Sequence, residues 1–316
     1  MLQQARHSDT AVLAEDLVKE FGNKRAVNGV SLQVPTGSIY GILGPNGAGK
    51  TTTIRMLLGI IDPSSGRRTL LGRSAPLDAA REVGYLPEER GLYPAMTARE
   101  AIAFMGALRG LPLREGRRRA ERMLTERGLV DWIKRPIRTL SKGMAQTVQL
   151  LGTLVHDPKL IVLDEPFSGL DAINQEKLEA QIRERADAGA TILFSTHVIA
   201  HAERLCERIA IIAGGTVAFE GAVDEARGKL RPIVQLTTRT EAGPWQSAIP
   251  PGARRSGRGW TFELPEGGPE PLLKALIDGG AGIETLSIER PGLHDAFVAI
   301  AGESAVRDMD LGGAPE

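Results

Sequence analysis

The sequence predicts an α/β protein built on a largely parallel sheet with helices on both faces. Apolar runs of strand length at residues 160–165, 191–196 and 208–215 alternate with segments of helical period at 176–186 and 197–207. Strands that alternate with helices in this way usually form parallel sheets. The chain has 316 residues, so we expect one large domain or two unequal ones.

The N-terminal part is expected to supply the first strands and one helix. Residues 10–34 consist of short β-type runs separated by turn residues, and they end at Pro35. The apolar run at 38–43 is a candidate buried strand that leads into a glycine-rich loop, and residues 51–60 continue with helical character. The predicted order is therefore strand, loop, helix.

The middle of the chain is expected to be helical. Within residues 88–152, the segments 96–110 and 113–129 place apolar residues three to four positions apart. Because the alternation of strands and helices resumes at Leu160, this part is predicted to be a helical insertion into the α/β core.

A second domain is expected after a shift in composition near Gly228. We assign residues 1–228 to the first domain and 229–316 to a small α+β accessory domain. Its predicted strands are 233–238, 260–265 and 283–289, its predicted helices are 271–280 and 293–300, and residues 243–259 are expected to form a loop.

Composition excludes several classes of protein. The 39 Lys and Arg residues balance the 39 Asp and Glu residues, which disfavours a globally basic nucleic-acid-binding protein. Cys206 is the only cysteine, so an intrachain disulfide and a cysteine-rich zinc site are excluded. The longest convincing apolar stretch, Ala101–Leu108, is far shorter than the roughly 20 residues of a membrane-spanning helix. Since the N-terminus does not resemble a signal peptide, we expect the chain in the cytoplasm.

A glycine-rich loop is the strongest chemical signal in the sequence. Residues 44–51, GPNGAGKT, match the pattern G-x-x-x-x-G-K-[ST] without a mismatch. Glycines let backbone N–H groups turn toward a β-phosphate, and the following helix presents its positive N-terminus to the same anion. Lys50 would neutralise the β- and γ-phosphates, and the Thr51 hydroxyl would ligate Mg²⁺. The motif predicts a nucleotide-binding loop.

Two carboxylates follow the apolar strand at 160–163. Such a strand delivers Asp164 and Glu165 to the carboxyl edge of the sheet, where the phosphates would lie. Asp164 suits the outer coordination of Mg²⁺, and Glu165 suits polarisation of an attacking water. With the upstream loop, this strand predicts the second half of a nucleotide site.

Further motifs complete an ordered set of six. Residues 140–144 (LSKGM) precede a helical run, residues 168–171 (SGLD) and 195–197 (STH) follow the acidic strand, and Glu88 follows the segment 85–87 (YLP). With these motifs, residues from about 10 to 225 resemble the ATP-binding subunit of ABC transporters. The resemblance implies a P-loop NTPase core (an ABC ATPase) with antiparallel β and helical subdomains.

The resemblance also implies roles for individual residues. Phe21 matches the aromatic residue that stacks on adenine, and His197 matches the switch histidine that contacts the γ-phosphate and the attacking water. Ser141 and Gly143 match the signature motif that closes over the γ-phosphate held by the opposite protomer. Asp171 matches the loop that crosses the dimer interface. The expected nucleotide contacts are Phe21, Gly44, Asn46, Gly47, Gly49, Lys50, Thr51, Thr52, Ser141, Gly143 and Asp171; the expected catalytic residues are Glu165, His197, Lys50 and Glu88; and the expected Mg²⁺ ligands are Thr51, Asp164 and Glu88.

Four substitutions depart from the usual motifs of this family. Lys142 replaces a usual glycine of the signature, and Met144 replaces the common glutamine. Thr147 stands where a basic residue is frequent, and Glu88 occupies the position of the Q-loop glutamine. The residues at these positions resemble those of a branch of exporter subunits that includes sodium-efflux and multidrug ATPases. Residues 290–297 (RPGLHDAF) resemble the tail of an accessory domain in the same branch.

These features lead to one principal functional expectation. We expect an ATPase that uses ATP and Mg²⁺ to power a membrane exporter, with two cassettes, in a homodimer, closing over two nucleotides. The membrane-spanning permease would be a separate chain, and the protein would lie peripherally on the cytoplasmic side of the plasma (inner) membrane. No nucleic-acid partner is expected.

Two other functions stay open. A nucleotide-dependent regulator with low turnover is suggested by Lys142 and Glu88. A non-transport ATPase of the same superfamily is disfavoured, because the chain has one cassette and no coiled-coil arm between Glu88 and Ser141. The arginine-rich segment 114–127 is interpreted as a solvated helix face. His197 and His201 have no third ligand nearby in the sequence, so we do not expect a metal site there.

Overall fold

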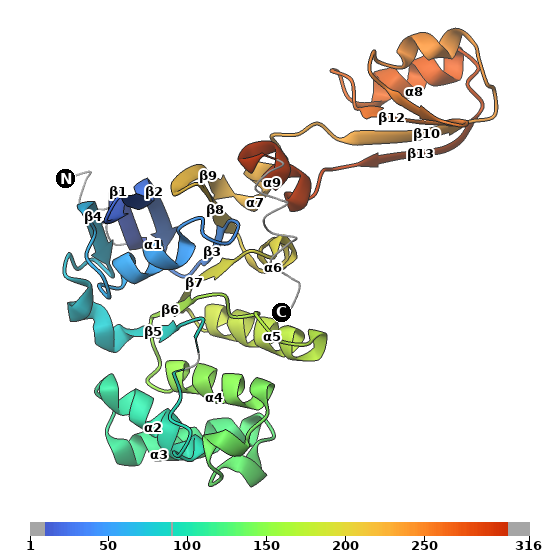
Figure 1. The fold of residues 1–316 in the computed structure, drawn as a ribbon. Coiled ribbons are helices and arrows are strands. Elements are labelled where there is room, and N and C mark those ends of the chain that lie inside the picture. The colour runs from blue at the N-terminus through green and yellow to red at the C-terminus, as the bar shows by residue number, and fades with distance from the viewer. Residues whose placement is uncertain (1–9, 90, 303–316) are drawn as a thin grey trace. The chain divides into compact units, whose positions relative to one another are not determined.

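The computed structural model describes residues 10–89 and 91–302 (Figure 1). They form two compact units, one of residues 10–223, with which residues 300–302 are grouped, and one of residues 224–299. The domain boundary predicted after Gly228 lies close to this division and stays a prediction.

The first unit begins with an antiparallel sheet. Its strands are β1 (Thr10–Phe21), β2 (Lys24–Pro35) and β4 (Ser65–Leu70), in the order β2-β1-β4. The short runs expected at 10–34 are thus two long strands joined by a tight turn. Pro35 ends β2, as its missing N–H would lead one to expect.

The main sheet has six strands, and five of them are parallel. They are β5 (Val83–Leu86), β6 (Leu160–Leu163), β7 (Thr191–Thr196), β3 (Ile39–Leu43), β8 (Arg208–Ala213) and β9 (Thr216–Ala222), in that spatial order, with β9 antiparallel to β8. In register, Leu163 pairs with Phe194 and Leu43 pairs with Thr196. The residues that follow β3, β6 and β7 therefore meet at one edge.

Helices cover both faces of this sheet, as the sequence predicts. On one face, Tyr40 and Ile42 pack in a core shared with Ile54 and Leu57 of α1 (Lys50–Leu57). The other face packs against α4 (Lys142–Leu154), α5 (Ala172–Asp187) and α6 (Ile199–Leu205). Adjacent residues of a strand point to opposite faces, which explains why β3 and β6 are buried along their whole length.

The predicted helical insertion is also present. It contains α2 (Ala98–Leu108), α3 (Leu113–Glu126) and the start of α4, with short 3₁₀ turns η2 (Val130–Trp132) and η3 (Ile137–Thr139); η1 (Pro76–Glu82) precedes β5. Arginines of α3 are ion-paired: Arg117 with Glu100, and Arg118 and Arg119 with Glu115. These pairs support the interpretation of α3 as a solvated charged face.

The second unit is a small α+β domain. Its elements are α7 (Val223–Arg227), β10 (Ile233–Thr238), η4 (Pro244–Ala248), β11 (Arg254–Ser256), β12 (Gly259–Glu263), α8 (Pro269–Asp278), β13 (Ile283–Glu289) and α9 (Leu293–Ala301), and its antiparallel sheet has the order β11-β12-β10-β13. The prediction of a loop at 243–259 was wrong, because η4 and β11 lie within it. Trp245 is 1% exposed and packs edge to face on Trp260, so burial of one large aromatic side chain orders η4.

None of the helices in the described ranges is long and apolar enough to cross a membrane.

Candidate active site

The glycine-rich loop joins β3 to α1, as predicted. Gly49 has a φ of 104°, and a Cβ atom there would lie 2.7 Å from the carbonyl oxygen of Ala26. At Gly44, a Cβ atom would lie 2.2 Å from the carbonyl oxygen of Ile212. The loop is thus pressed against neighbouring backbone at both ends, and only glycine fits at either position.

Lys50 is the first residue of α1, and its ammonium group is almost fully buried. Its Nζ donates to the carbonyl oxygens of Gly44 at 2.7 Å and Pro45 at 3.2 Å. It also lies 3.1 Å from Oε1 of Glu165. Because a buried charge is costly unless paired, these contacts hold a cation at the mouth of the loop, where an anion would approach.

Asp164 directly follows β6 and meets two hydroxyl groups. Its Oδ1 accepts hydrogen bonds from Thr51 Oγ1 at 3.1 Å and from Ser195 Oγ at 2.6 Å. Burial raises the pKa of Asp164 above its ordinary value, although both hydroxyl groups oppose the rise.

The other oxygen of this carboxylate provides a test for a metal site. Asp164 Oδ2 is buried and accepts no hydrogen bond from the described residues. A buried carboxylate oxygen beside a hydroxyl group is a donor set that suits a hard cation such as Mg²⁺. Asp164 and Thr51 therefore fit the metal expected from the sequence, although the described residues contain no larger cluster of metal-ligating side chains.

Glu165 links Lys50 to His197. The Nδ1 atom of His197 lies 2.9 Å from Glu165 Oε2; a carboxylate can only accept, so Nδ1 donates. Burial alone would raise the pKa of Glu165, but the His197 hydrogen bond and the charge of Lys50 outweigh it and hold the pKa below its ordinary value. Glu165 also has a φ of 46°, a left-handed conformation that is rare for this residue and is often found at active sites.

We call Lys50, Thr51, Asp164, Glu165, Ser195 and His197 the carboxylate cluster. Glu88 lies beside it, because Glu88, Asp164 and Glu165 line one cavity of about 370 Å³. Burial, and then the charges of Asp164 and Glu165, raise the pKa of Glu88. The negative charge of Glu88 beside Asp164 and Glu165 would oppose a phosphate that arrives without a cation.

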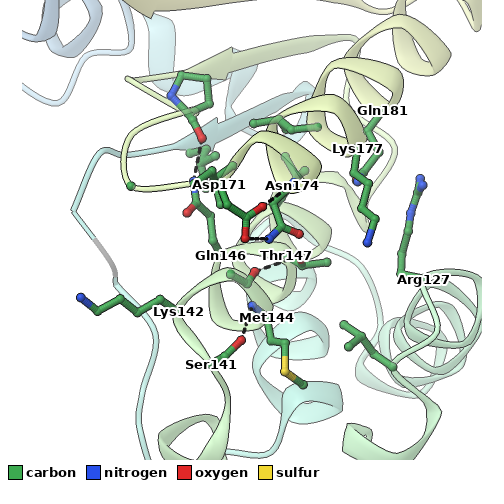
Figure 2. A pocket seen from close by; sticks show the side chains of 18 of the residues that line it. Arg127, Ser141, Lys142, Met144, Gln146, Thr147, Asp171, Asn174, Lys177 and Gln181 are labelled. Atoms are coloured by element: carbon green, nitrogen blue, oxygen red, sulfur yellow. Dashed lines mark hydrogen bonds between the residues drawn. The ribbon is translucent and has the colours of Figure 1, made fainter. Parts of the chain in front are cut away.

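A second group of predicted residues lies in a different pocket. Ser141 caps α4 by accepting from the backbone N–H of Met144, and Asp171 caps α5 by accepting from the backbone N–H and the side-chain amide of Asn174 at 2.8 and 3.0 Å (Figure 2). A Cβ atom on Gly143 would lie 3.2 Å from Asn174 Nδ2. We call Ser141, Gly143, Asp171 and Asn174 the capping face. It lines a cavity of about 640 Å³ that the glycine-rich loop does not line.

Phe21 lies at the end of β1 and is 52% exposed. The ammonium group of Lys19 lies 5.2 Å from the centre of its ring. Its remaining surface is open to solvent and available for stacking.

The structure thus brings together one part of the predicted site and leaves the other apart. Lys50, Thr51, Asp164, Glu165 and His197 are in contact, whereas the capping face lines a second cavity, which adjoins the cavity of Glu88 because Gln146 and Pro166 line both. Ser195 belongs to the STH motif, but the motif predicted no role for it. The signal that could have identified Ser195 was its position at the end of one predicted strand, since Asp164 follows the end of another.

The two histidines that share the 197–201 segment have separate partners. His201 is buried, contacts Glu179 through Nδ1 at 3.0 Å and stacks on Phe167 with ring centres 3.9 Å apart. His197 faces Glu165 instead. This arrangement agrees with the interpretation that the pair is not a metal site.

Comparisons with known proteins agree on one family. The family model described as ABC transporter matches residues 27–168. The uncharacterized ABC transporter ATP-binding protein YhaQ of Bacillus subtilis (strain 168) is 33% identical over 298 residues, which cover 91% of this chain and 97% of that protein. The daunorubicin resistance ATP-binding protein DrrA3 of Streptomyces coeruleorubidus is 29% identical over 308 residues, covering 94% of this chain and 97% of that protein. A solved structure of the ATP-binding subunit of an ABC transporter is 32% identical with a TM-score of 0.64, over 70% of this chain and 93% of that chain.

Proposed function

The chain belongs to the family of ABC transporter ATP-binding proteins, and from that premise we propose that it hydrolyses ATP with Mg²⁺ to drive export through a membrane-spanning partner. The observation that carries the proposal is the contact of Lys50 and His197 with the two ends of one buried carboxylate, Glu165. A cation for phosphates and a carboxylate held for an attacking water are the two parts that phosphoryl transfer to water requires.

Five residues of the carboxylate cluster have a proposed task, and so does Phe21. Lys50 neutralises the β- and γ-phosphates. Glu165 is kept ionised by Lys50 and His197, so it can orient a water for attack and accept its proton. Thr51 and Asp164 would hold Mg²⁺, which when bound neutralises charge on the transferred phosphoryl group. Phe21 would stack on the adenine ring.

The capping face is proposed to act on the nucleotide of a second cassette. Ser141 and Gly143 begin α4, so they offer a hydroxyl group and the positive end of a helix to a γ-phosphate. Since the glycine-rich loop does not line the cavity of this face, one chain is proposed to hold half of each of two sites. Binding of ATP would then close two copies head to tail, and hydrolysis would release them.

The direction of transport and the location are further parts of the proposal. A relative named for daunorubicin resistance aligns over nearly its full length, which favours export of a compound from the cell. Since the relatives are named as ATP-binding proteins of ABC transporters, we propose a membrane-spanning permease on a separate chain, with this protein at the cytoplasmic surface of the membrane.

The experiment that tests this proposal is the solution mass of Glu165→Gln with and without Mg-ATP. We expect a monomer without nucleotide and a dimer with it, because the substitution removes the base but keeps the groups that bind phosphate. The matched control is the double variant Lys50→Ala with Glu165→Gln, which should stay monomeric. A Glu165→Gln protein that binds ATP yet remains a monomer would contradict the homodimer.

A low-turnover regulator is the second candidate, and Glu88 is the observation that favours it. Glu88 lines the same cavity as Asp164 and Glu165 and adds negative charge where phosphates would bind. Steady-state ATPase assays of the wild type and Lys50→Ala separate the two functions. Turnover that depends on Lys50 supports the ATPase, and ATP binding without such turnover supports the regulator.

A further inference from the structure

One hydroxyl group lies between the two acidic residues of the carboxylate cluster. Ser195 is near the end of β7 and is fully buried. Because β6 and β7 are parallel and Leu163 pairs with Phe194, the residues that follow this pair, Asp164 and Ser195, lie next to each other. The Ser195 Oγ atom lies 2.6 Å from Asp164 Oδ1 and 2.9 Å from the backbone nitrogen of Glu165.

The chemistry of these two contacts determines where the hydroxyl proton points. A backbone N–H can only donate, so Ser195 Oγ accepts from Glu165. An ionised carboxylate can only accept, so the hydroxyl proton is directed to Asp164. Both hydrogen-bonding functions of Ser195 are therefore used, one on each acidic residue.

Each bond restrains a feature that would otherwise be free to move. The hydroxyl groups of Ser195 and Thr51 both donate to Oδ1 of Asp164, which orients the carboxylate so that Oδ2 stays buried without a hydrogen-bond donor from the described residues. At Glu165, the bond to the backbone nitrogen holds a residue in a left-handed conformation, with φ at 46°.

We propose that Ser195 is a positioning residue that sets Asp164 toward the metal and Glu165 toward His197 with a single hydroxyl group. The inference rests on the proposed function and adds a residue to it. Ser195 acts through the two carboxylates and has no proposed contact with nucleotide. Removal of a residue that orients a metal ligand in this way commonly lowers metal affinity or activity by about 10–100-fold.

The test compares Ser195→Ala with a matched control on the same strand. Thr191 starts β7, is buried, and its hydroxyl accepts a backbone N–H from Gly37 at 2.9 Å, so Thr191→Val removes an equivalent hydroxyl at the opposite end of the strand. The first measurement is the melting temperature of each protein with ATP present, as a function of the Mg²⁺ concentration. The second is binding of a fluorescent ATP analogue in EDTA, and the third is kcat and KM for Mg-ATP.

We expect Ser195→Ala to raise the Mg²⁺ concentration for half-maximal thermal stabilisation about 10–100-fold, whereas metal-free binding of the analogue changes less than about twofold. We expect kcat to fall more than KM rises, because Glu165 acts in the chemical step. Thr191→Val should keep the wild-type Mg²⁺ dependence. If Ser195→Ala and Thr191→Val behave alike, the proposal is overturned.

Two further variants test the proposal even if Ser195→Ala does not fold. Ser195→Thr keeps the hydroxyl group and should restore the Mg²⁺ dependence, whereas Ser195→Cys keeps the size with a weak donor and should not. Wild-type behaviour of both would also overturn the proposal. Failure of the wild-type protein itself to show Mg²⁺-dependent stabilisation by ATP would instead contradict the proposed function, before any variant is compared.

Discussion

The carboxylate cluster and the capping face differ in what surrounds their polar groups. In the cluster, Lys50 and Glu165 are both nearly fully buried, and each has charged or polar partners within the same chain. On the capping face, Ser141 and Asp171 are exposed and use their side chains to cap helices at the edge of a large cavity. One region is organised by contacts within the chain, and the other leaves the N-terminal ends of two helices exposed.

This difference leads us to assign separate steps to the two regions. Preorganised charges act on bound phosphates without further rearrangement, so the carboxylate cluster should govern nucleotide binding and chemistry. Exposed helix N-termini attract anions, so the capping face should matter only when a second nucleotide-loaded surface approaches. Substitutions that damage one region and spare the other can test this division.

The largest effect is expected from Lys50→Ala. The change removes the cation for the phosphates and leaves Glu165 buried without its ammonium partner. We expect steady-state ATPase activity to fall about 10²–10³-fold and analogue binding to weaken. Lys274→Ala, at an exposed position on α8, is the control. If Lys50→Ala binds the analogue as tightly as the wild type does, the carboxylate cluster does not take part in nucleotide binding.

A smaller effect is expected from Ser141→Ala. If this hydroxyl contacts the second nucleotide, its loss should lower ATPase activity about 10–100-fold, the range for one hydrogen bond to a charged group. Binding of the analogue to the monomer should not change. Thr97 is a matched control, because it caps α2 by accepting from the backbone N–H of Glu100 at 3.2 Å.

Both capping substitutions should cost about 1 kcal/mol of stability, since each removes one N-cap. Only Ser141→Ala should lose turnover as well. Equal losses of turnover in Ser141→Ala and Thr97→Ala would mean that the capping face acts through stability alone.

The smallest effect is a pH dependence from His201, which belongs to neither region. It contacts Glu179 of α5, the helix that Asp171 caps, and stacks on Phe167, two residues after Glu165. Burial lowers the pKa of His201 below its ordinary value of 6.5, although Glu179 opposes this. The unfolded chain therefore takes up the proton first as the pH falls.

The free energy of unfolding should consequently be highest above pH 6.5 and decrease below it, down to the lowered pKa of His201. One proton limits the slope to about 1.4 kcal/mol per pH unit. Denaturant unfolding of the wild type and His201→Gln between pH 5 and 7.5 measures this slope. An unchanged slope in His201→Gln would assign the pH dependence to other groups.

Local patterns were sufficient to predict most of the fold. Residues 44–51 form one contiguous motif, and the strand before it and the helix after it follow from the spacing of neighbouring apolar residues, so the loop between β3 and α1 could be placed without a structure. The same holds for the helical insertion and for three of the four strands in the sheet of the second unit. Prediction was wrong for 243–259, where burial of Trp245 orders η4; that contact depends on residues outside the segment.

The sequence by itself therefore determined which residues are chemically suited to bind a nucleotide, because composition and spacing along the chain are local properties. Only the tertiary structure decided which of them meet. Asp164 and Ser195 are separated by 31 positions and come within hydrogen-bonding distance because β6 and β7 are parallel and in register. The same packing puts Ser141 and Asp171 at the ends of α4 and α5, in a cavity apart from Lys50. Contacts between distant segments arise from strand register and helix packing. The spacing of residues along the chain determines neither of them.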